Sequence, residues 1–200
     1  RDHAERQVGI DFLITVPSVL TVRKCRELGI KRLKIGSSNL TNLLLLREIA
    51  KLGKDAEVYL STGMGTVEDI KVALSELGPA GKSCRLFHCT VSYPAPPETL
   101  NLRAIPTMKQ LFPKHCVGLS DHSLGTAAAV AAVALGAELI EKHFTLDKTQ
   151  EGPDHHFSAD PAELAALVKA VRATEVALGH DRKEPTPAEL EMRAKTRRFL

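Results

Sequence analysis

The chain has 200 residues, of which 44% are hydrophobic and 26% charged, and its formal net charge at pH 7 is +3. This composition is typical of one globular domain with a sizeable core, and it excludes disordered and fibrous proteins. Basic residues are scattered among acidic ones except in RAKTRR near the carboxyl terminus. The charge pattern therefore argues against a nucleic-acid partner.

Four cysteines are spread along the sequence without a C-x-x-C pair, and they lie in or beside apolar segments. Reduced thiols in a core have this pattern, which favours a cytoplasmic location. No run of 18 apolar residues occurs, and the polar start RDHAERQ lacks the apolar centre of a secretory signal. We therefore expect no membrane partner.

Short apolar runs alternate with longer segments of helical period. The runs are, in order, DFLITVPS, KRLKIGSS, AEVYLSTG, CRLFHCTVS, CVGLSDHS and ELIEKHFT. Predicted helices follow them at Ser18–Leu28, Leu40–Lys51, Val67–Leu77, Leu102–Leu111, Thr126–Leu135 and Pro161–Leu178. The sequence thus predicts six consecutive βα units.

Alternating βα units require a parallel sheet covered by helices, either doubly wound or closed as a (β/α)8 TIM barrel. The strand starts recur at an even spacing, and no G-x-G-x-x-G follows the first strand, so we favour the barrel. Six units are two short of closure. We expect residues 1–179 to form a partial TIM-barrel catalytic domain that lacks the first two βα units.

The composition changes after Gly179, where apolar periodicity gives way to charge and proline. We interpret residues 180–200 as a charged linker with a short helix, leading to a further segment beyond Leu200.

Two histidines end consecutive strands, His122 in SDHS and His143 in EKHF, with one helix-length segment between them. A βαβ unit brings such strand ends side by side, so both imidazoles come within reach of one divalent transition metal ion. The alternative is that either ring is a hydrogen-bonded core residue. His88 has no such counterpart, and we expect it to be structural.

Other strand ends offer a cation, hydroxyls and flexible backbone. Lys34 and Ser37 lie in KIGSS, Ser61 in STGMG and Ser120 in SDH. Phosphate and carboxylate groups are bound by this mixture, although the hydroxyls are equally typical of helix caps. Residues two apart on a strand share a face, so Ser120 is expected beside His122.

The segment EGPDHHFS follows the last strand and contains Asp154, His155 and His156. A carboxylate here suits the hydroxyls of a polyol, so Asp154 is a candidate for sugar binding. Adjacent loop histidines are more often simply solvated, and we expect this of His155 and His156.

Together these motifs resemble the sialic acid synthase family, which makes N-acetylneuraminic, legionaminic and related nonulosonic acids. The resemblance rests on KIGSSNLTN, STGMGT, HCTVSYPAP, NLRAI, GLSDHSLG, ALGAELIEKHFTLD, GPDHHFSADP and KEPTPAE, in this order. Many collinear motifs make it specific.

The resemblance implies a (β/α)8 barrel that condenses phosphoenolpyruvate with N-acetylmannosamine or a related acetamido sugar and releases phosphate. The implied catalytic residues, His122 and His143, hold Mn²⁺, or Mg²⁺ or Co²⁺. The ion polarises the sugar aldehyde for attack by C3 of phosphoenolpyruvate; water then adds at C2 and phosphate leaves. The implied phosphoenolpyruvate contacts are Lys34, Ser37, Ser61 and Ser120, and the implied sugar contacts are Tyr93, Asp154 and Asn39.

The chain departs from the family in three respects. Asn39 stands where the family usually has an acidic residue, and Val91 stands where it has asparagine, so two ligand contacts are altered. We expect no counterpart within residues 1–200 of the family's first two strands, which contain a further phosphoenolpyruvate-binding lysine. We likewise expect no counterpart within these residues of the antifreeze-like (SAF) domain, which supplies an arginine across a homodimer.

Two other functions stay open. One is a related phosphoenolpyruvate-dependent 3-deoxy-2-keto sugar acid synthase, although the motif SDHSLG argues against it. The other is a non-catalytic truncated barrel that serves as a binding or dimerisation module. For the isolated chain we expect self-association through the gap in the sheet, or marginal stability, with little turnover.

Overall fold

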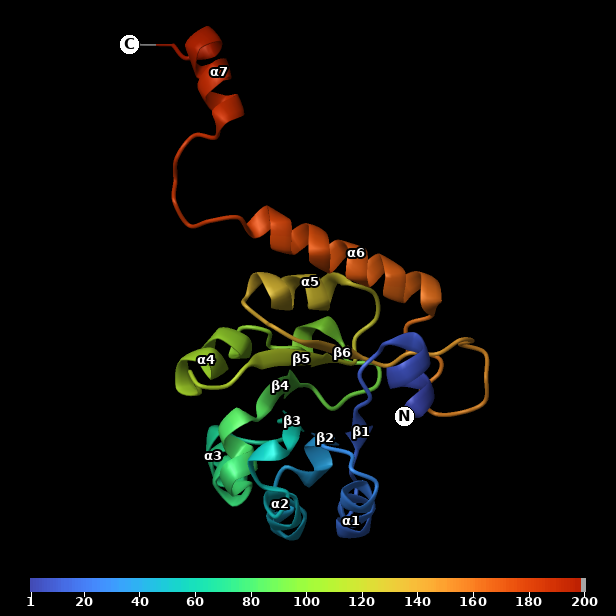
Figure 1. Ribbon diagram of the computed structural model, residues 1–200. Coiled ribbons are helices and arrows are strands. Elements are labelled where there is room, and N and C mark those ends of the chain that lie inside the picture. Colours follow the sequence, from blue (N-terminus) through green and yellow to red (C-terminus); the bar gives the residue numbers. More distant parts are fainter. Residues whose placement is uncertain (199–200) are drawn as a thin grey trace.

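The computed structural model describes residues 1–198, in which six parallel strands form one sheet in the order β1 to β6. The strands are β1 (Ile14–Thr15), β2 (Arg32–Ile35), β3 (Glu57–Ser61), β4 (Arg85–Cys89), β5 (Val117–Asp121) and β6 (Ile140–Lys142). Each strand pairs with the next one along the chain. The sheet curls, and the helices lie on its outer side (Figure 1).

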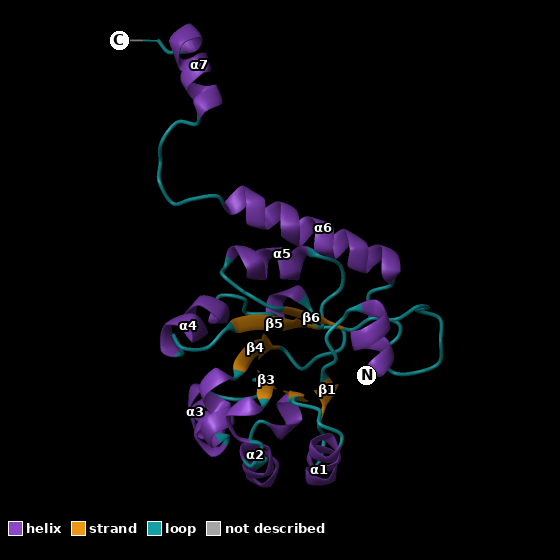
Figure 2. Ribbon diagram, viewed as in Figure 1, coloured by secondary structure: helices purple, strands orange, loops and turns teal. Residues whose placement is uncertain are grey.

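A helix follows each strand. These helices are α1 (Val19–Glu27), α2 (Leu43–Ala50), α3 (Val67–Glu76), α4 (Ala104–Leu111), α5 (Ala127–Ala134) and α6 (Pro161–Leu178). The alternation of strands and helices is evident in Figure 2. The six predicted βα units and the α/β class are confirmed, and the sheet is a curled half-barrel.

Polar side chains fix where several helices begin. The Ser18 hydroxyl accepts the Thr21 N–H at α1, and the Asp160 carboxylate accepts the Glu163 N–H at α6. The prediction of a helix from Leu40 was wrong by three residues. Asn42 caps α2 through the Leu45 N–H, so α2 starts at Leu43.

The outer face of the sheet supplies the core under the helices. Fully buried side chains alternate along the strands there, and they include Leu33, Ile35, Val58, Leu60, Leu86 and Val117. Burying one such side chain stabilises a fold by about 1.5–3 kcal/mol. The residues between them, such as Arg32 and Lys34 on β2, face the concave side of the sheet. The concave face therefore combines charged side chains with the rings of Tyr59 and Phe87, and it is more polar than the interior typical of a barrel.

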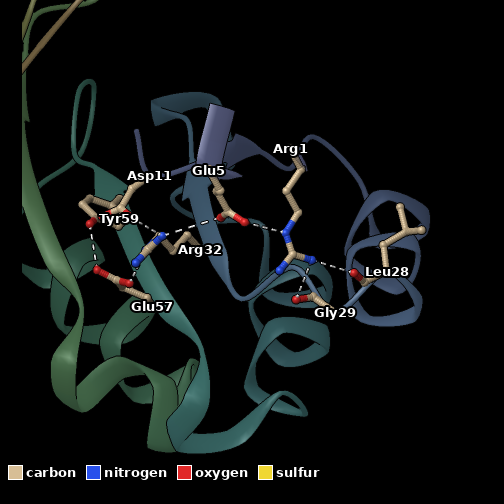
Figure 3. A network of polar contacts seen from close by, with 8 residues as sticks. All are labelled: Arg1, Glu5, Asp11, Leu28, Gly29, Arg32, Glu57 and Tyr59. Carbon is tan, nitrogen blue, oxygen red and sulfur yellow. Dashed lines mark hydrogen bonds and ion pairs between the residues drawn. The ribbon is translucent and has the colours of Figure 1, made fainter. Parts of the chain in front are cut away.

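A network of charges covers the amino ends of the first strands (Figure 3). Arg32 lies 2.8 Å from the Glu57 carboxylate on β3 and 2.9 Å from that of Asp11. Arg1 pairs with Glu5 at 2.9 Å and also donates to carbonyls at the end of α1. These contacts fasten the amino-terminal segment, including a short helix at His3–Val8 that the sequence did not predict, to β2 and β3.

The carboxyl-terminal segment leaves the rest of the fold after α6. A further helix, α7 (Pro187–Thr196), confirms the predicted short helix and stands apart from the sheet (Figure 1). All described residues from 179 onwards are exposed. Within residues 1–198 no helix is both long and apolar enough to cross a bilayer.

Candidate active site

The carboxyl ends of the strands surround a cavity of about 360 Å³. Its lining consists of Thr15, Lys34, Gly36, Ser37, Ser61, Cys89, Tyr93, Ser120, His122, Glu141, Lys142 and His143. Parallel strands end at the same edge, so residues far apart in sequence meet there. A second cavity of about 370 Å³ lies between β6 and α6, and it holds none of the predicted site residues.

Lys34 is one of two lysines that line this cavity, with Lys142, and it is only 6% exposed. Its ammonium lies 2.8 Å from Glu141 Oε1 and 5.3 Å from the centre of the Phe87 ring. The Ser120 hydroxyl donates to the same Glu141 oxygen at 2.7 Å. Glu141 therefore joins two residues that the sequence assigned to anion binding, and the expected meeting of β2 and β5 residues is observed.

Ser61, at the end of β3, has a buried hydroxyl without a hydrogen-bond partner. Among the described residues it is the only fully buried side-chain nitrogen or oxygen in this condition. Leaving such a group unpaired costs about 1–3 kcal/mol. Because Ser61 lines the cavity, its unpaired hydroxyl is available to a polar group that enters the cavity.

Ser37 is held by the loop that follows β3. The Gly63 N–H donates to the Ser37 hydroxyl at 3.1 Å. A Cβ at position 63 would lie 2.8 Å from that oxygen and 2.6 Å from the Val91 side chain. Glycine thus lets the loops after β2, β3 and β4 approach one another closely at the cavity.

The two predicted metal-binding histidines are neighbours, with ring centres 5.2 Å apart. The His122 Nδ1 donates to the Thr90 carbonyl at 2.8 Å. The His143 Nδ1 lies 3.6 Å from the Asp154 carboxylate. Within residues 1–198, no hydrogen bond engages the Nε2 atom of either ring.

The environments of these rings shift their pKa values in opposite directions. Burial and the charge of His122 lower the pKa of His143, despite the opposing charges of Asp154 and Glu141. Burial also disfavours the charged form of His122, but contacts with Cys89 and the Thr90 carbonyl outweigh it and raise the pKa. Two adjacent imidazoles therefore do not take up protons at the same pH.

An aromatic wall borders the histidines. The Tyr93 ring centre lies 4.3 Å from that of His122 and 5.5 Å from that of Phe157. The Phe157 ring is 5.0 Å from His143. Tyr93 is 47% exposed, so one of its faces is available to a ligand.

Other candidates lie away from the cavity lining. The Asn39 amide oxygen accepts from Asn42 at 2.9 Å, and Asn39 is not among the lining residues. His88 Nε2 lies 2.7 Å from the Leu100 carbonyl, as expected of a structural residue. The expectation that His155 is simply solvated was wrong, because its Nδ1 lies 2.7 Å from the Thr145 hydroxyl.

Sequence reasoning missed the cavity residues Thr15, Cys89, Glu141 and Lys142, as well as Phe157. Glu141 had a usable signal, because it precedes His143 by two residues, as Ser120 precedes His122. Thr15 is the register partner of Lys34, and register is not evident in a single sequence.

Comparison with known structures agrees with this architecture. A truncated 3-deoxy-D-arabino-heptulosonate 7-phosphate synthase from Thermotoga maritima matches 86% of this chain and 68% of its own, with a TM-score of 0.72. At 20% sequence identity this likeness concerns the fold alone. The crystal structure of N-acetylneuraminic acid synthetase from Leptospira borgpetersenii matches 99% of this chain and 70% of its own, with a TM-score of 0.86 and 36% identity.

Sequence comparison gives the same group of proteins. N,N'-diacetyllegionaminic acid synthase from Campylobacter jejuni is 44% identical over 94% of this chain. The present chain spans 56% of that relative's length. It likewise spans about half the length of the other curated proteins that it matches. The sequence model described as the NeuB family matches residues 2–183, and the chain therefore belongs to the NeuB family.

Proposed function

We propose that this chain forms the phosphoenolpyruvate-binding and metal-binding part of an enzyme that condenses phosphoenolpyruvate with an acetamido sugar. The products are a nonulosonic acid and phosphate. Family membership and the synthase names of the relatives support this proposal. The observation that carries it is the unpaired, buried Ser61 hydroxyl in a cavity lined by two lysines and two imidazoles.

The anion is held by Lys34 and the strand-end hydroxyls. An ammonium has three donor hydrogens, and Glu141 occupies one of them, so the others are available to phosphate or carboxylate. Ser61, Ser37 and Ser120 supply hydroxyls around the same space. Charge-assisted hydrogen bonds are the stronger ones, so Lys34 contributes most to affinity.

The histidine pair fits a divalent ion by the chemistry of its donors. Each ring has Nδ1 engaged by or facing an oxygen, which orients imidazole ligands in metal sites and leaves Nε2 free. No group of three or more His, Cys, Asp or Glu residues suited to a metal occurs in residues 1–198, so water and substrate would complete the coordination. His122 and His143 would hold Mn²⁺, or Mg²⁺ or Co²⁺, and such an ion would supply a Lewis acid for the sugar aldehyde that C3 of phosphoenolpyruvate attacks.

The chain's own residues perform the remaining tasks. Glu141 lies between Lys34 and Ser120, beside the proposed anion, where it can accept a proton from the water that adds at C2. Tyr93 offers an aromatic face to the sugar, and Asp154 offers a carboxylate to its hydroxyls. The proposed sugar contact of Asn39 uses its side-chain NH2 group, because its amide oxygen already accepts from Asn42.

Several further features belong to this proposal. The six βα units correspond to the last six of a closed (β/α)8 barrel, and residues 180–200 form a linker toward an antifreeze-like domain in a homodimer. Cys25, Cys84, Cys89 and Cys116 are free thiols, and this supports a cytoplasmic location.

The test is phosphate release from phosphoenolpyruvate in the presence of Mn²⁺ and a panel of aldoses. The panel contains N-acetylmannosamine, its 6-phosphate, a 2,4-diacetamido sugar, arabinose 5-phosphate and erythrose 4-phosphate. We expect turnover with an acetamido sugar and its loss with EDTA. Turnover only with arabinose 5-phosphate or erythrose 4-phosphate, which lack an acetamido group, would instead identify a 3-deoxy-2-keto sugar acid synthase.

Binding is measured separately, because turnover can require residues outside this chain. Calorimetry with phosphoenolpyruvate and with Mn²⁺ is performed on the chain and on His122→Ala. We expect His122→Ala to lose Mn²⁺ binding while it stays folded. A chain that binds neither ligand would be a non-catalytic module, and undiminished Mn²⁺ binding by His122→Ala would refute the metal assignment.

A further inference from the structure

A buried ion pair lies directly before the two histidines. Asp121 is the last residue of β5 and Lys142 the last residue of β6, and they are register partners across the sheet. The Lys142 ammonium donates to Asp121 Oδ2 at 2.8 Å, and the two side chains are 6% and 0% exposed.

The Lys142 ammonium also reaches past His122. It donates to the Ser123 carbonyl at 2.5 Å, so it contacts the residue before His122 and the residue after it. The Ser123 hydroxyl and N–H donate to Asp121 Oδ1 at 2.7 and 2.9 Å. One ammonium therefore fixes both sides of His122, and Lys142 itself directly precedes His143 in the chain.

The backbone pairing of β5 with β6 ends at Asp121 and Lys142, so both histidines lie beyond it. Each histidine is tied separately to a neighbouring loop. The Ala95 N–H donates to the His122 carbonyl at 2.9 Å, and the Ala159 N–H donates to the His143 carbonyl at 2.8 Å. Of the described hydrogen bonds, those of Lys142 alone connect residues 121–123 with β6 beyond the paired backbone.

We propose that Asp121 and Lys142 are positioning residues that set the separation of His122 and His143 for a shared divalent ion. This inference rests on the proposed two-histidine site. A buried ion pair is weak evidence for stability, because apolar residues of similar volume often stabilise a fold equally well. A pair that instead fixes the geometry of adjacent ligands acts on metal affinity, as residues behind metal ligands commonly do.

The test compares Mn²⁺ affinity and amide exchange in the chain and in three variants. Lys142→Met alone leaves a buried, unpaired carboxylate, so the principal variant is Asp121→Asn with Lys142→Met, which removes both charges. Lys142→Arg restores a donor that can reach both oxygens. Ile105→Ala, on the buried face of α4, is the control for lost stability.

We expect the double variant to bind Mn²⁺ at least about tenfold more weakly, as is usual for changes behind metal ligands. Lys142→Arg should recover part of the affinity, and Ile105→Ala should retain it. Exchange of the Ala95 and Ala159 amides, measured by NMR without metal, should accelerate relative to other sheet amides in the double variant. Ile105→Ala should instead accelerate exchange of all sheet amides by a similar factor, with no selective effect on Ala95 and Ala159.

The two measurements separate the inference from the proposed function. Unchanged relative exchange of the Ala95 and Ala159 amides in the double variant would overturn the positioning role, whatever the metal affinity. Equal losses of affinity in the double variant and Ile105→Ala would overturn it as well. Accelerated exchange in a chain that binds no Mn²⁺ would keep the positioning role and refute the metal site.

Discussion

The two ends of the concave face differ in how completely their polar groups are paired. At the amino ends, Arg32 and Glu57 have several partners each, and Figure 3 shows their network continuing to the first residues of the chain. At the carboxyl ends, Lys34 has one carboxylate partner and Ser61 has none. These residues lie on the same strands and the same face. Paired charges thus hold the fold together at one end, and incomplete pairing at the other end leaves polar groups free for the proposed ligands.

The largest effect should come from Lys34→Met at the carboxyl end. It removes the lysine ammonium that is bonded to Glu141 and the principal charge proposed for binding an anion. We expect about a 100-fold loss of phosphoenolpyruvate affinity by calorimetry, as for a charge-assisted contact.

The matched control for this prediction is Lys31→Met at the amino end, where an exposed ammonium lies 3.4 Å from Asp55. Its affinity for phosphoenolpyruvate should equal that of the unchanged chain. Equal losses in Lys31→Met and Lys34→Met would show that net charge, rather than the cavity, attracts the anion.

For Glu57→Gln at the amino end we expect a loss of stability without a loss of phosphoenolpyruvate affinity. The Glu57 carboxylate accepts from Arg32 and from the Tyr59 hydroxyl, and it lies 2.8 Å from Arg85. Losing these bonds to a charged group should lower the free energy of unfolding by about 2 kcal/mol. Urea denaturation measures the loss, while phosphoenolpyruvate affinity should stay unchanged. A weakened affinity at full stability would contradict the division between the two ends.

Ser61→Ala sharpens the comparison, because stability and binding should change in opposite directions. Removing an unpaired, buried hydroxyl relieves its desolvation cost, so thermal unfolding should occur at the same or a higher temperature. The affinity for phosphoenolpyruvate should fall about tenfold, as for one lost hydrogen bond to a charged group. Ser120→Ala is the contrasting variant, since its hydroxyl bonds to Glu141 and its loss should cost stability. A destabilised Ser61→Ala would mean that this hydroxyl has a structural role.

Part of the difference between the two ends of the concave face can be predicted from the sequence. The pairing of its polar groups cannot, and the reason is physical. Hydrophobic periodicity is local, so it located all six βα units and placed Lys34, Ser61 and His122 at the same end of the sheet. Pairing is not local. Whether a hydroxyl such as Ser61 has a partner depends on strand register and rotamers, and the partnership of Lys34 with Glu141 joins strands from opposite parts of the chain.

The amino-terminal network was missed for the same reason. Arg32 and Glu57 are register partners on neighbouring strands, yet in the sequence they are ordinary charged residues within apolar runs. The motifs of the resemblance cluster at strand ends, where ligands bind, and contain little information on the opposite end.

The smallest expected effect is the pH dependence of the amino-terminal network. Burial tends to raise the pKa of Glu57, but hydrogen bonds from Tyr59 and Arg32 and the charge of Arg85 outweigh it, and the pKa lies below its ordinary value of 4.5. A carboxyl with a lowered pKa in the folded state stabilises the fold above its unfolded pKa, and this contribution disappears as the pH falls through the folded value. Between about pH 6 and pH 3, the difference in unfolding free energy between the chain and Glu57→Gln should therefore narrow. Denaturation at several pH values measures the difference, in which titration of the other carboxyl groups cancels. If this difference in unfolding free energy stayed constant with pH, Glu57 would stabilise the fold through its shape and uncharged contacts. The charges at the amino end would then contribute less to stability than the hydrogen bonds to Arg32 and Tyr59 indicate.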